Sequence, residues 1–380
     1  MGCDVVVATD ADSAIPGASM RVVFEDPETA AAGLVDLVGD VDGVVGTDGA
    51  AVAVAAAAAR RLGRRTNAAS ALTAAGNKLM QRRAAADAGV SQPDFASIDS
   101  DAVPPWSVFP ALVKPLDRSA SQGVVRVDSV AELLAAVSVV REIVGDDAPL
   151  LVEAFVPGVE VAVEGLLRAG RADVLAVFDK PETPQGPTFP ETLLVSPARV
   201  APEVVVRLVD ALERVVAAIG LREGPVHAEF KVDGDEVWFL ELAARTIGGL
   251  CSRTLDRGGL SLEQLVLHHA LDLALPTPVA DDVTATGVLM LPVTATGRIA
   301  ATRGVDEARA VEGVTSVVLA VGVGERVVAL PAGDRYLGFV FARAATAAAV
   351  EAALRAAWAA IHIEIDAEID PGPGADISVL

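Results

Sequence analysis

Hydrophobic and polar residues alternate over the first 75 positions in a way that predicts strands followed by helices. The second and third short apolar runs are each followed by a stretch with helical character. The expected strands are residues 4–8, 21–24 and 43–46, and the expected helices are residues 27–38 and 50–62. Strands that alternate with helices indicate a parallel, doubly wound sheet, so this segment predicts an α/β lobe.

The remainder of the chain predicts two further groups of elements. The expected strands of the middle part include 111–114, 124–127 and 150–155, and its expected helices include 130–144 and 202–220. Residues 226–232 and 236–240 alternate apolar and polar positions around Asp233-Gly234-Asp235, which is typical of a β-hairpin. Residues 276–282 resemble a linker, and a last lobe with a helix at 345–360 follows.

Charge and composition exclude several classes of function. Lys and Arg number 30 against 52 Asp and Glu, so the formal charge is 30 − 52 = −22. Nucleic acid and anionic membranes need a basic face, and we expect neither as a partner. The longest apolar run, residues 50–59, is far shorter than the roughly 20 residues of a membrane span. The two cysteines form no disulfide framework and no signal peptide is evident, so we expect a cytoplasmic protein.

Two glutamates on the expected hairpin are the first candidates for chemistry. Glu229 and Glu241 lie on its two strands and could face each other across the ladder. Two close carboxylates repel unless a cation lies between them, and Mg²⁺ prefers oxygen ligands. Arg245 follows four residues later and could bind a carboxylate or phosphoryl group. The alternative is an exposed hairpin with ordinary surface acids.

A second candidate is the strand that ends at Lys114 and the small-residue loop that follows it. Backbone N–H groups in such a loop can hold phosphate oxygens, and the lysine supplies a point charge. The alternative is a flexible surface loop. A third candidate is the segment 151–160, where an apolar strand ends in Pro157-Gly158 between acids. Its backbone could pair with an adenine edge, although a solvated turn is also an interpretation.

The order of these motifs resembles the ATP-grasp superfamily. The stretches that carry the resemblance are 77–90, 113–127, 151–165 and 224–249. It implies an α/β (α+β) fold with a short N-terminal doubly wound lobe, two ATP-binding subdomains and a C-terminal closing domain. The implied boundaries are 1–75, 76–280 with a hinge near 153–156, 281–368, and a tail at 369–380.

The resemblance also implies roles for individual residues, with ATP and Mg²⁺ (or Mn²⁺) as cofactors. Those expected at the nucleotide are Lys78, Lys114 and Lys180 on phosphates, Ser119, Ser121, Gln122 and Gly123 in a mobile loop over them, Glu153, Ala154, Phe155 and Val156 at adenine, and Glu160 at ribose. Glu229 and Glu241 would hold the metal, and Arg245 would steady an acyl-phosphate. His227 could stabilise a developing charge, or it could be a hydrogen-bonded structural histidine.

One departure narrows the resemblance. Many members have Glu-x-Asn-Pro-Arg, where Asn gives a third metal oxygen, but here Ala243 takes that position. The pattern Glu-x-Ala-x-Arg is similar to that of the L-amino acid ligases, as are the segments 179–191, 297–299 and 333–338. By that likeness Glu191 would face the substrate amino group; the alternative is a loop acid with no role. Gly248 and Gly249 predict a roomy acceptor pocket.

The function implied is ATP-dependent joining of a carboxylate to an amine through an acyl-phosphate, giving an amide, ADP and phosphate. Amino acids are the expected substrates and a dipeptide or amino-acid conjugate the expected product. The alternatives are an ATP-grasp ligase or carboxylase acting on a cofactor or purine intermediate, and a catalytically silent ATP-binding protein. Relatives begin with an additional strand–helix unit. This chain starts at what resembles their second strand, residues 4–8. A sheet without the first strand would have an open edge that a partner chain could cover, so a homodimer is a hypothesis.

Overall fold

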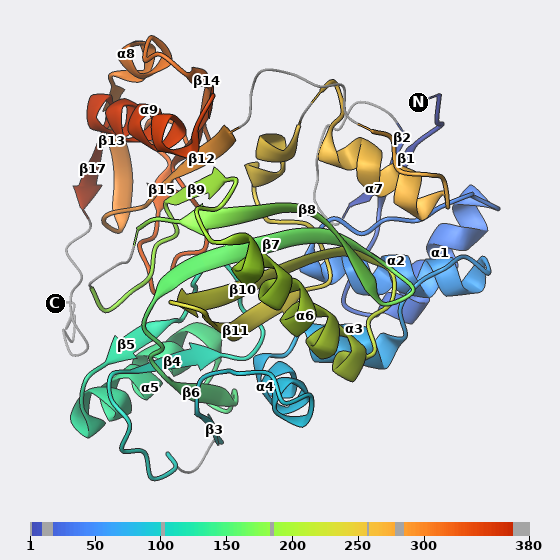
Figure 1. Cartoon of the computed structure of the whole chain (residues 1–380), viewed down its shortest axis with the longest axis horizontal. Coiled ribbons are helices and arrows are strands. Elements are labelled where there is room, and N and C mark those ends of the chain that lie inside the picture. Colours follow the sequence, from blue (N-terminus) through green and yellow to red (C-terminus); the bar gives the residue numbers. More distant parts are fainter. Residues whose placement is uncertain are drawn as a thin grey trace, which may run out of the picture.

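An antiparallel sheet of eight strands forms the centre of the molecule (Figure 1). The computed structural model describes residues 2–9, 18–99, 103–182, 186–256, 258–277 and 285–367. In sheet order the strands are β11 (Glu236–Ala243), β10 (Gly224–Asp233), β7 (Val159–Arg168), β8 (Arg171–Lys180), β9 (Leu193–Ser196), β12 (Ala285–Leu291), β16 (Gly338–Ala344) and β14 (Val314–Leu319). The expected hairpin is confirmed as β10 and β11.

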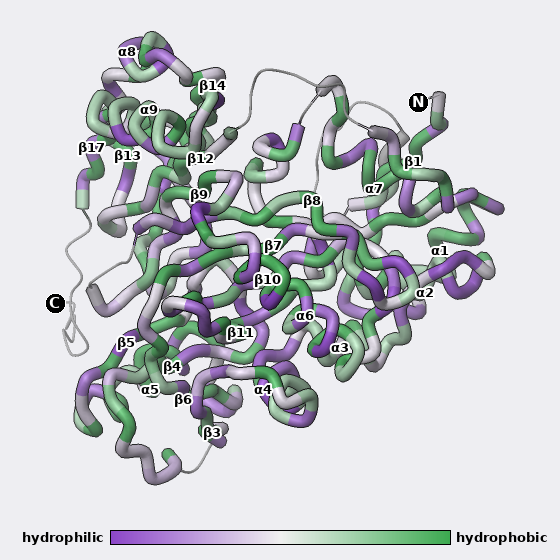
Figure 2. The backbone as a smooth tube through the Cα atoms, in the orientation of Figure 1, coloured by the Kyte–Doolittle hydropathy of each residue, from purple (hydrophilic) through white to green (hydrophobic). Residues whose placement is uncertain are grey.

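Apolar side chains hold this sheet against helix α6 (Pro202–Ile219). Leu208, Leu212 and Val215 lie on one face of α6 and are fully buried against the sheet. The helix ends at Gly220, whose φ of 86° is accessible to glycine at little cost. Figure 2 shows hydrophobic and hydrophilic residues alternating along α6, the pattern of a helix with one face on a core.

A smaller sheet lies beside β10 and β11 and forms a second layer of the molecule (Figure 1). Its strand order is β3 (Phe95–Ile98), β6 (Leu150–Ala154), β4 (Ala111–Pro115) and β5 (Val125–Val127). Helix α5 (Val130–Val144) covers it, capped by the Ser129 side chain. These elements confirm the strands and helix expected between residues 111 and 155.

The N-terminal lobe differs from expectation in two places. It consists of the parallel pair β1 (Val6–Thr9) and β2 (Ala18–Arg21), and the helices α1 (Pro27–Val38), α2 (Gly49–Arg61), α3 (Ala69–Ala75) and α4 (Lys78–Asp87). The expected strand at 21–24 lies earlier, and the expected strand at 43–46 is wrong. A Cβ on Gly46 would lie 2.6 Å from the Val52 Cα, and one on Gly43 3.2 Å from the Ala270 carbonyl oxygen. The two glycines therefore let an irregular segment pass close to other backbone.

The C-terminal part continues the central sheet. Strand β12 pairs with β9 on one side and β16 on the other, so the sheet crosses the sequence boundary expected near residue 280. Helix α7 (Leu262–Ala270) and the 3-10 turn η1 (Cys251–Leu255) precede that boundary. Beyond it lie α8 (Val305–Arg309), α9 (Ala347–Ala360) and a small sheet of β15 (Arg326–Val327), β13 (Gly297–Arg303) and β17 (His362–Ala367). The expected tail at 369–380 lies outside the described residues.

One buried arginine joins three of these layers. Arg82 of α4 is fully buried and donates to Glu153 of β6 at 2.6 Å. It also donates to the carbonyl oxygens of Phe239 (3.2 Å) and Leu240 on β11. The contacts tie α4 and the smaller sheet to the edge of the central sheet.

We expect Arg82→Met to lower the free energy of unfolding by about 3–5 kcal/mol, because Glu153 would remain as a buried charge with one partner fewer. Arg83→Met is the matched control, because Arg83 is exposed on the same helix. Urea denaturation at neutral pH would measure both variants. Equal losses in the two variants would contradict this account of Arg82.

Candidate active site

A cavity of about 510 Å³ opens between the two sheets and the C-terminal segment 334–339. All the sequence-predicted site residues line it except Gln122 and Gly123. The five side chains expected at a magnesium–triphosphate are among them, namely Lys78, Lys114, Glu229, Glu241 and Arg245. The structure thus gathers residues from α4, β4, β10 and β11 at one place.

The β10–β11 pairing sets the positions of the two acids. Glu229 and Glu241 are direct partners in the antiparallel register, next to a bulge between Glu229 and Phe230. Lys78 Nζ lies 3.2 Å from Glu241 Oε2 and donates to the Arg118 carbonyl oxygen at 2.6 Å. Lys78 begins α4, which the Asn77 side chain caps. The start of α4 therefore places Lys78 against Glu241, one of the two acids predicted to bind metal.

Lys114 and Glu153 form a buried ion pair rather than two separate contacts in the cavity. Lys114 Nζ lies 2.5 Å from Glu153 Oε2, and Arg82 binds the other carboxylate oxygen. Burial opposes ionisation of Glu153, but Arg82 and Lys114 hold the pKa of its carboxyl below the usual value. Burial lowers the pKa of Lys114, although Glu153 counteracts it.

The segment expected at adenine lies beside an aromatic and cationic group. The Phe155 ring lies 6.4 Å from the Phe189 ring, with the Arg126 guanidinium 5.0 Å from its centroid. The Phe155 N–H donates to the Pro110 carbonyl oxygen at 2.9 Å. Of the two backbone N–H groups at Phe155 and Val156, both expected at adenine, the one at Val156 is therefore the predicted donor to the base. An aromatic face of this kind can stack on a planar base.

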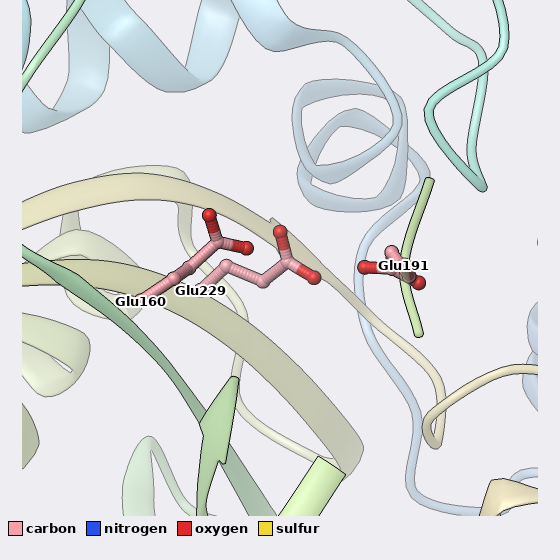
Figure 3. A group of neighbouring side chains, drawn as sticks. All are labelled: Glu160, Glu191 and Glu229. Atoms are coloured by element: carbon pink, nitrogen blue, oxygen red, sulfur yellow. The ribbon is translucent and has the colours of Figure 1, made fainter. Parts of the chain in front are cut away.

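Three carboxylates that line the cavity lie close together (Figure 3). Glu160, Glu191 and Glu229 come from three segments and their oxygens lie within 4.8 Å of one another. Lys180 Nζ donates to all three, at 2.7, 2.6 and 2.6 Å. Burial would lower the pKa of Lys180, but the three acids raise it well above its usual value. Lys180, expected on phosphates, is the counter-ion of this cluster.

The acids of this cluster differ in their protonation. Burial raises the pKa of Glu191, with the negative charge of Glu229 adding to it. Burial has the same tendency at Glu229, but Lys180 and His227 hold its pKa well below the usual range. Glu229 is therefore more firmly ionised than Glu191.

His227 is held between two acids on the face of the sheet that lines the cavity. Its Nδ1 contacts Glu164 of β7, and its Nε2 lies 3.2 Å from Glu229 Oε1. Burial opposes protonation, yet Glu164 and Glu229 raise the pKa of His227 to about 10. This shift favours the protonated imidazole at neutral pH. A hydrogen-bonded imidazolium is compatible with both roles that the sequence predicts for His227, a structural one and stabilisation of a developing charge.

Arg245, Gly248 and Gly249 also line the cavity. The Arg245 guanidinium donates to the Thr246 carbonyl oxygen at 2.8 Å. A Cβ on Gly248 would lie 3.8 Å from Arg245 Nη1, but one on Gly249 would lie 3.1 Å from the Phe339 ring. The space expected at Gly249 is therefore filled by Phe339, which corrects the expectation of a roomy pocket there.

Sequence reasoning did not find several residues of the site. Tyr336 of the C-terminal part donates to Glu191 Oε2 at 3.2 Å, and burial together with Glu191 raises its pKa well above the usual value. Arg82 and Glu164 support Glu153 and His227. Glu164 could have been inferred from strand alternation, because it lies opposite His227 in the register. Tyr336 and Arg82 lie in the segments 333–338 and 77–90 that carry the family resemblance, but their partners are remote in sequence and could not be inferred from it.

Two family models match the chain. The ATP-grasp domain matches residues 107–254, and the L-amino acid ligase C-terminal domain 2 matches residues 289–366. With the fold and the cavity, they show that the chain carries an ATP-grasp domain and is a ligase enzyme, and ATP-grasp enzymes use ATP.

One similar solved structure is that of an L-amino acid ligase from Bacillus licheniformis. The identity is 26% and the TM-score 0.81, over 96% of this chain and 93% of that chain. Two others share the fold: a phosphoribosylglycinamide synthetase from Anaerococcus prevotii (13% identity, TM-score 0.64, 92% and 88% covered) and an N5-carboxyaminoimidazole ribonucleotide synthetase from Thermus thermophilus (21%, 0.61, 93% and 89%). No curated protein matches the chain in sequence.

The described residues contain no helix that is both long and apolar enough to cross a membrane.

We expect Lys180→Met to lower the free energy of unfolding by about 3–5 kcal/mol at pH 7, because three carboxylates would lose their shared counter-ion. The folded-state pKa of Glu229 lies well below 4.5, so its contribution is present above about pH 4.5 and lost as the pH falls. The pKa of Lys180 is raised above 10.5, so its contribution is present below about pH 10.5. Urea denaturation at pH 7, and at a series of lower pH values that reaches below the folded-state pKa of Glu229, would measure the loss on the acid side.

Lys231→Met provides the comparison, because Lys231 Nζ lies 3.6 Å from Glu160 Oε2 and contacts a single acid of the cluster. We expect a smaller loss of stability there. A Lys180→Met loss that stays the same as the pH falls through the folded-state pKa of Glu229 would show that ion pairing is not its cause.

Proposed function

We propose that this ligase joins the carboxylate of one amino acid to the amine of another. The observation that carries the proposal is the shared cavity, which Lys78, Lys114, Glu229, Glu241 and Arg245 line together with Glu191 and Tyr336. Cations and metal-type acids suit a nucleoside triphosphate, while a carboxylate beside a phenol suits an ammonium group. The similarity to an L-amino acid ligase supports the same assignment.

The reaction has two steps. A substrate carboxylate oxygen attacks the γ-phosphorus of ATP, the bond to the bridging oxygen breaks, and ADP leaves. The amine nitrogen then attacks the carbonyl carbon of the acyl-phosphate, loses a proton, and phosphate leaves as the amide forms. The first step gathers several negative oxygens, so fixed cations around them lower the barrier.

Residues of the chain match these demands in separate parts of the cavity. Lys78 and Lys114 would contact phosphate oxygens, and Arg245 would bind the acyl-phosphate with its planar donor group. The Ser119–Gly123 loop would cover the phosphates. Glu191 would accept hydrogen bonds from the substrate ammonium group before that group is deprotonated.

The donor set fits a magnesium ion. Glu229 and Glu241 are register partners on paired strands, both line the cavity, and each offers carboxylate oxygens, the ligands that Mg²⁺ prefers. Bound there, the ion would offset the charge of the triphosphate. Because Ala243 has no oxygen in its side chain, the third ligand must come from elsewhere, such as water or phosphate.

A screen for phosphate release with Mg–ATP and pairs of amino acids tests the substrate class, with mass spectrometry of the products. We expect release to need both amino acids and to match formation of a peptide bond. If Mg–ATP raises the melting temperature but no pair stimulates release, the amino-acid assignment is wrong. A purine intermediate or a silent ATP-binding protein would then be the better interpretation.

Glu241→Ala tests the metal site. We expect ADP formation to fall by roughly 100-fold or more. Without the Glu241 carboxylate the metal ion would be held less well, and the metal is the cation that would offset the negative charge of the transition state. Glu236→Ala is the matched control, since Glu236 is exposed on the same hairpin. Coupled-enzyme detection of ADP would measure both, and activity close to wild type in Glu241→Ala would contradict the assignment.

A further inference from the structure

The loop expected to cover ATP contacts the C-terminal part of the chain rather than projecting freely. The Gln122 side-chain amide donates to the Ala332 carbonyl oxygen at 2.8 Å, and the Gly123 N–H donates to the Pro331 carbonyl oxygen at 2.8 Å. Ser119 and Ser121 line the cavity, whereas Gln122 and Gly123 do not. The loop thus places three residues, Ser119, Ala120 and Ser121, at the cavity and two, Gln122 and Gly123, against the C-terminal segment.

The shape of the loop requires such support. Ala120 and Ser121 have φ values of 53° and 57°, in the left-handed region that non-glycine residues disfavour. Backbone of this kind persists when surrounding contacts hold it. On one side Gly123 packs against β4, where an added Cβ would lie 2.9 Å from Pro115 Cδ. On the other side the contacts are those with Pro331 and Ala332.

The segment that holds the loop also reaches the other end of the cavity. Tyr336 lies four residues after Ala332 and donates to Glu191 Oε2. A second connection runs in parallel, because the Arg126 N–H donates to the Pro187 carbonyl oxygen at 2.8 Å, four residues before Glu191. Both segments that join the β4–β5 region to the central sheet therefore end at the Glu191–Tyr336 pair.

We propose that Gln122 is a positioning residue through which the C-terminal segment Pro331–Tyr336 holds the Ser119–Gly123 loop over ATP and links nucleotide binding to the amino-acid end of the cavity. The inference rests on the proposed function for the identity of the two ligands. It assigns the C-terminal part a role in binding the nucleotide in addition to closing the substrate pocket. Binding at either end then favours the same docked arrangement, and such coupling is reciprocal.

The test uses the full chain, a non-hydrolysable ATP analogue and no amino acid. Gln122→Met keeps the length of the side chain and removes the donor, while Gln122→Lys keeps a donor and serves as the matched control. By isothermal calorimetry we expect Mg–AMP-PNP to bind Gln122→Met about three- to ten-fold more weakly, the effect of one lost hydrogen bond. Gln122→Lys should bind close to wild type, and melting temperatures would confirm that both variants fold.

Amide hydrogen exchange separates positioning from a general loss of stability. In the wild type, Mg–AMP-PNP should slow exchange of residues 333–337, which lie outside the loop. In Gln122→Met that response should disappear, although nucleotide still slows exchange near Lys114. A purely structural role would lower the melting temperature and leave the response of 333–337 to nucleotide unchanged.

Two results would overturn the proposal. One is wild-type affinity for Mg–AMP-PNP in Gln122→Met, and the other is a wild-type response of residues 333–337 in that variant. Because neither measurement includes an amino acid, their outcome is independent of whether amino-acid pairs are the substrates. Failure of the phosphate-release screen alone would overturn the proposed function and leave this contact between loop and C-terminal segment standing.

Discussion

The antiparallel pairing of β10 with β11 is the constraint on which the site depends. It sets Glu229 opposite Glu241, and the neighbouring strand β7 sets Glu164 opposite His227. A shift of one residue in this register would turn the acids to the other face of the sheet, where α6 packs. The hydrophobic alternation that buries Ala228, Phe230 and Val232 therefore also fixes the charges on the cavity side.

Charge balance explains why so many ionisable groups can be buried together. An isolated buried charge is costly, but here each cation contacts an acid: Lys180 three glutamates, Lys78 Glu241, and Lys114 Glu153. Bound triphosphate would offer these lysines new partners, and a metal would take the place of a lysine beside the acids. On the proposed function, binding of Mg–ATP would therefore exchange partners: the lysines would contact phosphate oxygens, and the glutamates would contact the metal.

The continuous sheet explains how the C-terminal part takes part in the site. Because β12 pairs with β9, residues far along the chain are held rigidly beside the ATP-grasp domain. Phe339 of β16 fills the space next to Gly249, and Tyr336 meets Glu191. The substrate end of the cavity is therefore built by two parts of the sequence that meet through sheet pairing, and its size is decided where they meet.

The sequence by itself determined the local elements and the chemical groups. The hairpin, the amphipathic helix at 202–220 and the acids at 229 and 241 follow from patterns of period two or 3.6 over short distances, and the structure confirms these elements. The prediction for the segment 43–46 was wrong, because the close approach of Gly46 to Val52 and of Gly43 to Ala270 leaves no pattern of apolar and polar positions. Only the tertiary structure decided which groups are partners. Arg82 and Glu153 are 71 residues apart, Tyr336 and Glu191 are 145 apart, and Gln122 and Ala332 are 210 apart. Such contacts depend on how sheets and loops pack in three dimensions, and the side chains involved have the same local surroundings in sequence as ordinary surface residues. Residue type and spacing therefore specify what chemistry is available, while packing selects the partner of each charge.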